Sequence, residues 1–167
     1  FNTNGFLQEW FGITLNNQYL LFDNKWGSDR GFIWKTAAGL FAALPFGKKL
    51  FGVGPDCFMP YSYSIPEYAE KLYQYWKPNI LTNAHNEFLN LLICIGIAGL
   101  LAFIAMLCMG VARFYRASRK SPLILAGMLC ILAYAGSNFF CYQQVCCTPF
   151  LFIIMGLAES VLRRLEK

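Results

Sequence analysis

The chain has 167 residues, of which 57% are apolar and 14% are charged, and its mean hydropathy is +0.42. Soluble domains carry about 25% charged residues, so this composition excludes an ordinary soluble protein and predicts an integral membrane protein. The net charge of +5 does not indicate nucleic acid binding, because residues 1–87 hold seven basic and seven acidic side chains and the excess lies after them.

The start of the chain carries no targeting signal. It begins with Phe1, and its first residues contain neither a basic segment nor the apolar run of a signal sequence. We therefore expect the chain to be the C-terminal part of a longer protein, whose preceding transmembrane helices would pack against it. Residues 1–23 show no clear period and are predicted as loop with room for a short strand or helix.

Two helices are predicted before the first long apolar run. Apolar residues recur at helical spacing over residues 29–44, with Ser28 as the expected N-cap and Pro45 closing the helix. Pro66 opens a second, shorter helix that reaches Trp76. The Gly-x-Gly at residues 52–54 lacks the sequence context of a phosphate-binding loop, so it predicts tight turning of the backbone.

Three membrane spans are predicted in the second half of the chain. No charged residue occurs between Phe88 and Ala112, a run long enough to cross the roughly 30 Å hydrocarbon core as a helix. Thr82 or Asn83 is expected to cap this helix, which would place His85 in its first turn, and Gly96 would allow close helix approach. The predicted spans are residues 85–112, 123–141 and 145–160. The predicted fold is an all-α membrane protein: residues 1–84 form a partly helical extracytoplasmic loop region, and residues 85–167 form a three-helix transmembrane segment.

Basic residues predict the orientation of these spans. They form two clusters. The first, after the first span, is Arg113, Arg116, Arg119 and Lys120, and the second, at the end of the chain, is Arg163, Arg164 and Lys167. Short basic segments stay in the cytoplasm, so both clusters are expected there. Residues 1–84 would then be extracytoplasmic and the C-terminus cytoplasmic.

Cysteine and histidine usage does not indicate a metal site. The seven cysteines show no metal-ligand spacing, and the chain holds one histidine. We therefore expect no metal and no cofactor, and the cysteines are interpreted as small apolar side chains.

Several segments, in this order, resemble the O-antigen ligase and O-antigen polymerase superfamily. They are residues 27–35 (GSDRGFIWK), 50–58 (LFGVGPDCF), 84–90 (AHNEFLN) with 96–100 (GIAGL), and a final span that starts at Thr148-Pro149-Phe150. The resemblance implies a multi-pass protein of the bacterial cytoplasmic (inner) membrane. Such glycosyltransferases move a glycan from an undecaprenyl-pyrophosphate carrier to lipid A core, to a growing polysaccharide or to a protein.

The resemblance also assigns two site residues. The arginine of the family's R-x-x-x-W motif corresponds to Arg30, and the histidine of its H-N motif corresponds to His85. Ligases of the family use a further arginine upstream that this chain does not contain. The chain alone is therefore expected to be inactive.

The chemistry of the two side chains agrees with these roles. A guanidinium binds phosphate oxygens in a bidentate way and stays charged, so Arg30 suits the pyrophosphate. A neutral imidazole can take the proton of the acceptor hydroxyl, so His85 suits catalysis by a metal-independent, inverting transfer. The possible supporting residues are Lys35, Asp56, Asn86 and Glu87. The simpler alternatives are a surface ion pair for Arg30, with Asp29 or another acid, and helix capping for His85.

Two other functions compete with glycosyl transfer. A lipid-linked oligosaccharide flippase or another transporter would place ionisable residues within its spans, whereas here they gather in the outer loop region. A structural membrane segment whose loop binds a partner would need neither motif. Between ligase, polymerase and protein transferase the sequence does not decide.

Overall fold

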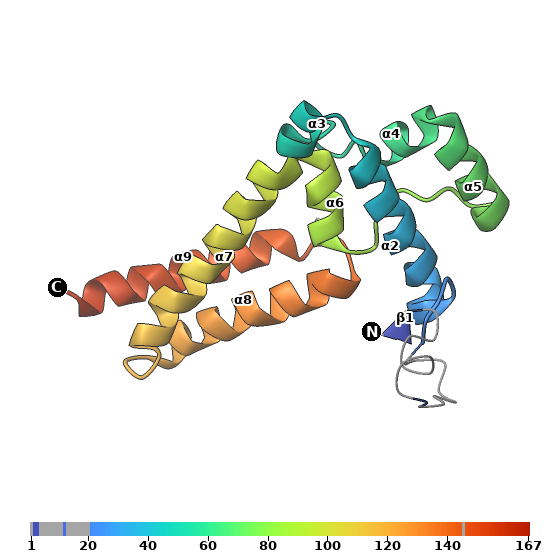
Figure 1. Ribbon diagram of the computed structural model, residues 1–167. Coiled ribbons are helices and arrows are strands. Elements are labelled where there is room, and N and C mark those ends of the chain that lie inside the picture. The colour runs from blue at the N-terminus through green and yellow to red at the C-terminus, as the bar shows by residue number, and fades with distance from the viewer. Residues whose placement is uncertain (1, 4–11, 13–20, 145) are drawn as a thin grey trace.

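The computed structural model describes residues 2–3, 12, 21–144 and 146–167, and most of these are helical (Figure 1). Two short strands, β1 (Asn2–Thr3) and β2 (Leu21–Phe22), form a parallel pair. The helices are α2 (Trp26–Ala43), α3 (Phe46–Phe51), α4 (Phe58–Ser64), α5 (Pro66–Trp76), α6 (Glu87–Cys94), α7 (Gly96–Ala117), α8 (Pro122–Phe140) and α9 (Thr148–Leu165). Most of the predicted loop at residues 1–23 lies outside the described residues.

The helices bury two separate apolar cores. The first lies between α2 and the shorter helices α4, α5 and α6, and its fully buried side chains include Ile33, Leu40, Phe58, Leu72 and Ile93. The second lies between α7, α8 and α9, and it includes Phe114, Ile124, Ile131, Leu151 and Leu162. In Figure 1 the three long helices extend away from the group of shorter ones. The chain therefore has a compact group of helices, α2 to α6, joined to a bundle formed by α7, α8 and α9.

Two of the long helices have the length and composition of membrane spans. Among the described residues these are α7 and α8, and most of their surface is exposed, with Leu101, Met109 and Leu129 each more than half accessible. The predicted second span corresponds to α8, whose first turn holds Pro122 and whose N-cap Ser121 accepts the Leu123 N–H at 3.3 Å. The third span is not confirmed, because α9 carries Glu159, Arg163 and Arg164 and does not qualify.

The predicted first span is wrong as a single helix. α6 ends at Cys94, and α7 starts at Gly96, whose φ of 72° lies outside the helical region. The freed carbonyls of Ile93 and Cys94 accept the backbone N–H groups of Val53 and Gly54, at 3.0 and 2.9 Å. The break is thus stabilised by a loop that is distant in sequence.

Glycines at this break permit close backbone contact. A Cβ atom at Gly52 would collide with the Cys94 carbonyl, and one at Gly96 would collide with the Leu50 carbonyl. Gly52 and Gly54 have φ values of 81° and 132°, so the predicted tight turning of the backbone is confirmed. Gly96 allows the predicted close approach of another helix, because the Leu50 carbonyl that it meets belongs to the last turn of α3.

The local helix predictions were partly right. α5 has the predicted bounds, Pro66–Trp76, whereas α3 and α4 were not predicted. The helix predicted over residues 29–44 is present as α2, but Ser28 does not cap it: Gly27, Ser28 and Asp29 all have positive φ, and no side chain caps the helix. Regular helical geometry starts only after these three residues.

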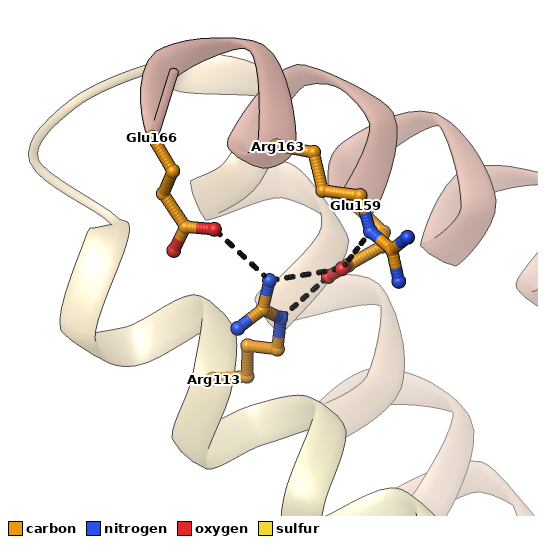
Figure 2. A network of polar contacts seen from close by, with 4 residues as sticks. All are labelled: Arg113, Glu159, Arg163 and Glu166. Carbon is orange, nitrogen blue, oxygen red and sulfur yellow. Dashed lines mark hydrogen bonds and ion pairs between the residues drawn. The ribbon is translucent and has the colours of Figure 1, made fainter.

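A charged network joins the C-terminal ends of α7 and α9 (Figure 2). Arg113 binds both carboxylate oxygens of Glu159, at 2.6 and 2.9 Å, and its Nη2 also reaches Glu166 at 3.3 Å. Arg163 donates to the same Glu159 at 2.8 Å. The two basic clusters that follow α7 and α9 therefore lie at one end of the bundle.

Candidate active site

The candidate residues meet at the segment that connects α8 to α9, here called the linking segment, residues 140–144. The Phe140 carbonyl accepts a hydrogen bond from Arg30 Nε at 2.9 Å. The Tyr142 ring packs edge-on against the His85 imidazole, with centroids 5.6 Å apart. The Gln143 N–H donates to Glu87 Oε2 at 2.9 Å. Residues from α2, from the turn before α6 and from α6 itself are thus joined at one end of the bundle, opposite the charged network.

The non-helical start of α2 orients the side chain of Arg30. Its Nη1 donates to the Gly27 carbonyl at 2.6 Å, across the three residues with positive φ. That conformation costs about 1–2 kcal/mol for a non-glycine residue such as Ser28. Asp29 is held there by Tyr75, whose hydroxyl donates to its carboxylate at 2.7 Å.

The guanidinium of Arg30 retains binding capacity. It forms no ion pair with any described residue, so the simple ion pair with Asp29 is not present in this part of the chain. Its Nη2 makes no hydrogen bond within the described residues. The half-buried side chain can therefore offer charge and N–H donors to an anion.

His85 lies in a turn before α6 rather than in the helix. Its φ is 47°, and its N–H donates to Asn83 Oδ1 at 3.0 Å. The prediction that Thr82 or Asn83 caps the helix is wrong, because Asn86 does so by accepting the Leu89 N–H at 3.0 Å. The sequence could not separate these residues, since each is a good capping type.

The surroundings of His85 favour its neutral form. Burial of the imidazole lowers its pKa below the usual 6.5, and the positive charge of Arg30 lowers the pKa further. At neutral pH the ring therefore has a nitrogen lone pair available to accept a proton.

Glu87 is a buried carboxylate in the first turn of α6. Only 2% of the surface of Glu87 is exposed to solvent. Burial raises its pKa above 4.5, the charge of Asp56 adds to this effect, and the hydrogen bond from the Gln143 N–H opposes it. The carboxyl group is thus held close to a second acidic residue and to the linking segment.

A pocket of about 710 Å³ opens next to these residues. Its walls come from the loop before α4, the segment before α6, α6 itself, the linking segment and the start of α9, and they include Asp56, Glu87, Asn90, Tyr142, Gln143 and Thr148. The pocket has the volume of a small-molecule binding site, which typically measures about 300–1,000 Å³.

A family model described as O-antigen ligase matches residues 3–104, which is more than half of the chain. The chain belongs to the O-antigen ligase family. The matched region contains Arg30, His85 and the Gly52–Gly96 contact. Searches of curated proteins and of solved structures gave no match.

Membership of the O-antigen ligase family confirms the resemblance seen in the sequence. The members of this family are O-antigen ligase-like glycosyltransferases that are integral to the membrane. Their partners are in general a lipid-linked glycan and an acceptor. The apolar surfaces of α7 and α8 agree with this location.

The remaining candidate residues of this O-antigen ligase family member lie differently. Lys35 donates to Asn24 Oδ1 at 3.2 Å and lies over the Phe22 ring, so its contacts are with the segment before α2. Asn86 is 4% exposed and is occupied by its capping hydrogen bond. Asp56 and Glu87 both line the pocket.

Sequence reasoning missed the linking segment as part of the site. Its polar run between two apolar helices, Tyr142, Gln143 and Gln144, is the signal from which it could have been found. Within the described residues, no group of three or more His, Cys, Asp and Glu side chains could hold a metal ion.

Proposed function

We propose that this chain forms part of the active site of a membrane glycosyltransferase that moves a glycan from undecaprenyl-pyrophosphate to an acceptor hydroxyl. The observation that carries the proposal is that Arg30 and His85 both contact the linking segment, Arg30 at the Phe140 carbonyl and His85 at the Tyr142 ring. They belong to different motifs, yet they are close enough for the charge of one to lower the pKa of the other. A cation for the leaving group and a neutral base are the two groups that this transfer requires.

The proposed reaction is a single displacement. The acceptor oxygen attacks the anomeric carbon, and the bond from that carbon to the pyrophosphate oxygen breaks with the electron pair leaving on the pyrophosphate. His85 takes the proton of the acceptor hydroxyl, and Arg30 binds the pyrophosphate as its negative charge develops. The configuration at the anomeric carbon inverts, and no metal ion takes part.

The supporting residues have distinct proposed roles. Asp56 and Glu87 contact the substrate from the pocket. Asn86 holds the turn that carries His85, because its side chain caps the helix that follows. Lys35 acts only indirectly, by binding Asn24 before the start of α2.

The membrane arrangement is also a proposal. We infer that α9 is a third span beside α7 and α8, with Glu159 neutralised by Arg113 and Arg163 near the cytoplasmic surface. Residues 1–84 would then form the extracytoplasmic region of a protein of the bacterial cytoplasmic membrane. The support is the placement of both basic clusters at the end of the bundle opposite the candidate site, because basic segments stay in the cytoplasm.

Transfer by the full-length protein in nanodiscs tests the function. With a labelled undecaprenyl-pyrophosphate glycan, Arg30→Gln and His85→Ala should each slow transfer by about 100-fold or more. Lys71→Gln, on the exposed face of α5, should leave the rate unchanged. The acceptor that becomes labelled distinguishes ligase, polymerase and protein transferase.

Three results would contradict the proposal or part of it. Folded Arg30→Gln and His85→Ala variants that transfer at the wild-type rate would remove both residues from the mechanism. Movement of the lipid-linked glycan across the bilayer with no transfer to any acceptor would establish a flippase instead. A rate abolished by a metal chelator would overturn the metal-independent step.

A further inference from the structure

An apolar groove of about 480 Å³ lies on the surface between α7 and α8. Most of the residues that line it belong to α7, from Ile104 to Tyr115, and Ile131 and Ala135 of α8 form part of the opposite wall. None of the lining residues is charged. Because α7 and α8 have the composition of membrane spans, this groove would face hydrocarbon rather than water.

The groove has the length of one leaflet of the membrane. Ile104 and Tyr115 are eleven residues apart on α7, which corresponds to roughly 16 Å along a helix. The hydrocarbon core is roughly 30 Å thick, so one leaflet contributes about 15 Å of it. The groove therefore matches one acyl chain of a phospholipid in both length and chemistry.

Two arginines follow the groove at its Tyr115 end. Arg119 comes four residues after Tyr115, and Ser118 between them has helical φ and ψ, so the groove face of α7 continues towards Arg119. Arg116 comes four residues after Ala112, which also lines the groove. Both arginines are exposed, and neither forms an ion pair in the described part of the chain.

The acidic side chains at this end of the bundle already bind other arginines. Glu159 binds Arg113 and Arg163, and Glu166 also binds Arg113 (Figure 2). The sequence contains no other acidic residue after position 87. The first turn of α8 has none either, so the positive end of its helix dipole adds to the charge there. The groove thus ends in a positive charge that an external anion can neutralise.

We propose that the groove and the two arginines bind an anionic phospholipid, with one acyl chain between α7 and α8 and the headgroup phosphate at Arg116 and Arg119. Such a lipid joins an apolar chain to a negative charge, in the arrangement that this surface complements. A guanidinium binds phosphate oxygens in a bidentate way. A zwitterionic phospholipid has the same chain, but its cationic amine would lie among like charges, so it should bind more weakly.

Native mass spectrometry of the full-length protein in detergent measures the binding of added lipid. Phosphatidylglycerol should bind at least tenfold more tightly than phosphatidylcholine with the same acyl chains. Arg116→Gln combined with Arg119→Gln should reduce this preference to less than threefold. Lys48→Gln combined with Lys49→Gln removes the same charge from α3 and should preserve the preference.

A second pair of variants tests the groove without a change in charge. Ala112→Trp fills the groove and should weaken the binding of both phospholipids by at least fivefold. Met109→Trp is the matched control and should leave binding unchanged, because Met109 is exposed on α7 but does not line the groove. Free glycerol 3-phosphate in hundredfold excess should not displace phosphatidylglycerol, since it has no acyl chain.

Several results would overturn the proposal. Equal binding of the two phospholipids to the wild type would remove the role of the arginines, and displacement by glycerol 3-phosphate would indicate a simple phosphate site. Unchanged binding to folded Ala112→Trp would mean that another part of the full-length protein covers the groove. Because no glycan is present in these measurements, none of these results bears on the proposed glycosyl transfer.

Discussion

Arg30 and His85 act on each other through charge. Burial would lower the pKa of His85 by itself, and the guanidinium of Arg30 lowers it further. The two residues lie on separate elements, α2 and the turn before α6. The Phe140 carbonyl of the linking segment accepts a hydrogen bond from Arg30 and so holds its side chain in place. The electrostatic coupling can therefore be measured independently of catalysis.

Replacing Arg30 with Gln should raise the pKa of His85. The variant loses the positive charge that disfavours the imidazolium, so the pKa moves up towards 6.5 while the burial effect remains. The measurement is a pH titration by NMR of the full-length protein labelled at histidine, with His85→Gln to assign the signal. Lys71→Gln is the control and should leave the titration unchanged; a pKa that stays constant or falls in Arg30→Gln would contradict the coupling.

Glu87→Gln should change stability in a way that depends on pH. Because the pKa of Glu87 is raised in the folded state, its ionisation lowers the stability of the wild type as pH rises through 4.5 and the folded pKa. Gln lacks this effect and can still accept the hydrogen bond from the Gln143 N–H. The melting temperature of the variant relative to wild type should therefore be higher at pH 7.5 than at pH 4. The opposite trend would mean that Glu87 is stabilised as a carboxylate.

At the scale of elements, the contact between residues 52–54 and the α6–α7 break joins the loop before α4 to the start of α7. Two N–H groups of the loop satisfy carbonyls that the break leaves free, and two glycines allow the backbones to touch. This contact connects the loop before α4 to the first membrane helix. The pocket lies directly beside it, since Pro55, Cys94 and Ile95 line its wall.

Gly96→Ala should destabilise the protein strongly. A side chain at a φ of 72° costs about 1–3 kcal/mol, and the added Cβ would also collide with the Leu50 carbonyl. Gly136→Ala in α8 is the matched control, because a Cβ there meets nothing within 4 Å. Thermal unfolding in nanodiscs should show a clear loss for Gly96→Ala and an equal or slightly higher midpoint for Gly136→Ala. Equal midpoints for both variants would refute the close contact.

The elements also show what the sequence could reveal. Pro66 and Pro122 mark helix starts by local chemistry: α5 begins at the predicted residue, and α8 begins one residue before the predicted span. The break at Gly96 is invisible locally, because the apolar run continues through it and the carbonyls it frees are satisfied by a distant loop. Ser28 is a good N-cap by type, yet tertiary contacts of Asp29 and Arg30 hold it at positive φ.

The candidate site, like the helices, could be predicted where the sequence carries a local signal and not where distant segments meet. Arg30 and His85 were found through their motifs, and Glu87 and Asp56 through their charge. The linking segment was harder to predict, because its hydrogen bonds to Arg30 and Glu87 are made by backbone groups, the Phe140 carbonyl and the Gln143 N–H, which any sequence would supply. Only the folded chain shows where such groups lie.

For the whole molecule, polar chemistry is divided between the two ends of the bundle. The candidate site and the pocket lie where α8 ends and α9 begins, whereas the Arg113 network and both basic clusters lie at the other end (Figure 2). The surfaces of α7 and α8 between these ends are apolar.

Topology reporters fused along the chain should reproduce this division. A fusion after Lys120 should report the cytoplasm, and one after Gln143 should report the extracytoplasmic side, because basic residues stay in the cytoplasm. Replacing Arg116, Arg119 and Lys120 with Gln should weaken this orientation, and replacing Lys71 with Gln, on α5, should not. The same reporter signal at both positions would mean that α8 does not span the membrane.

The linking segment contributes to the site in two separate ways, through its backbone groups and through its side chains. It holds Arg30 and Glu87 through its backbone, while the side chains of Tyr142, Gln143 and Gln144 line the pocket. Substitutions at residues 143 and 144 can therefore alter the lining of the pocket and leave the anchoring hydrogen bonds in place. Libraries confined to these two positions would change what the pocket can bind while keeping Arg30 and Glu87 where they are.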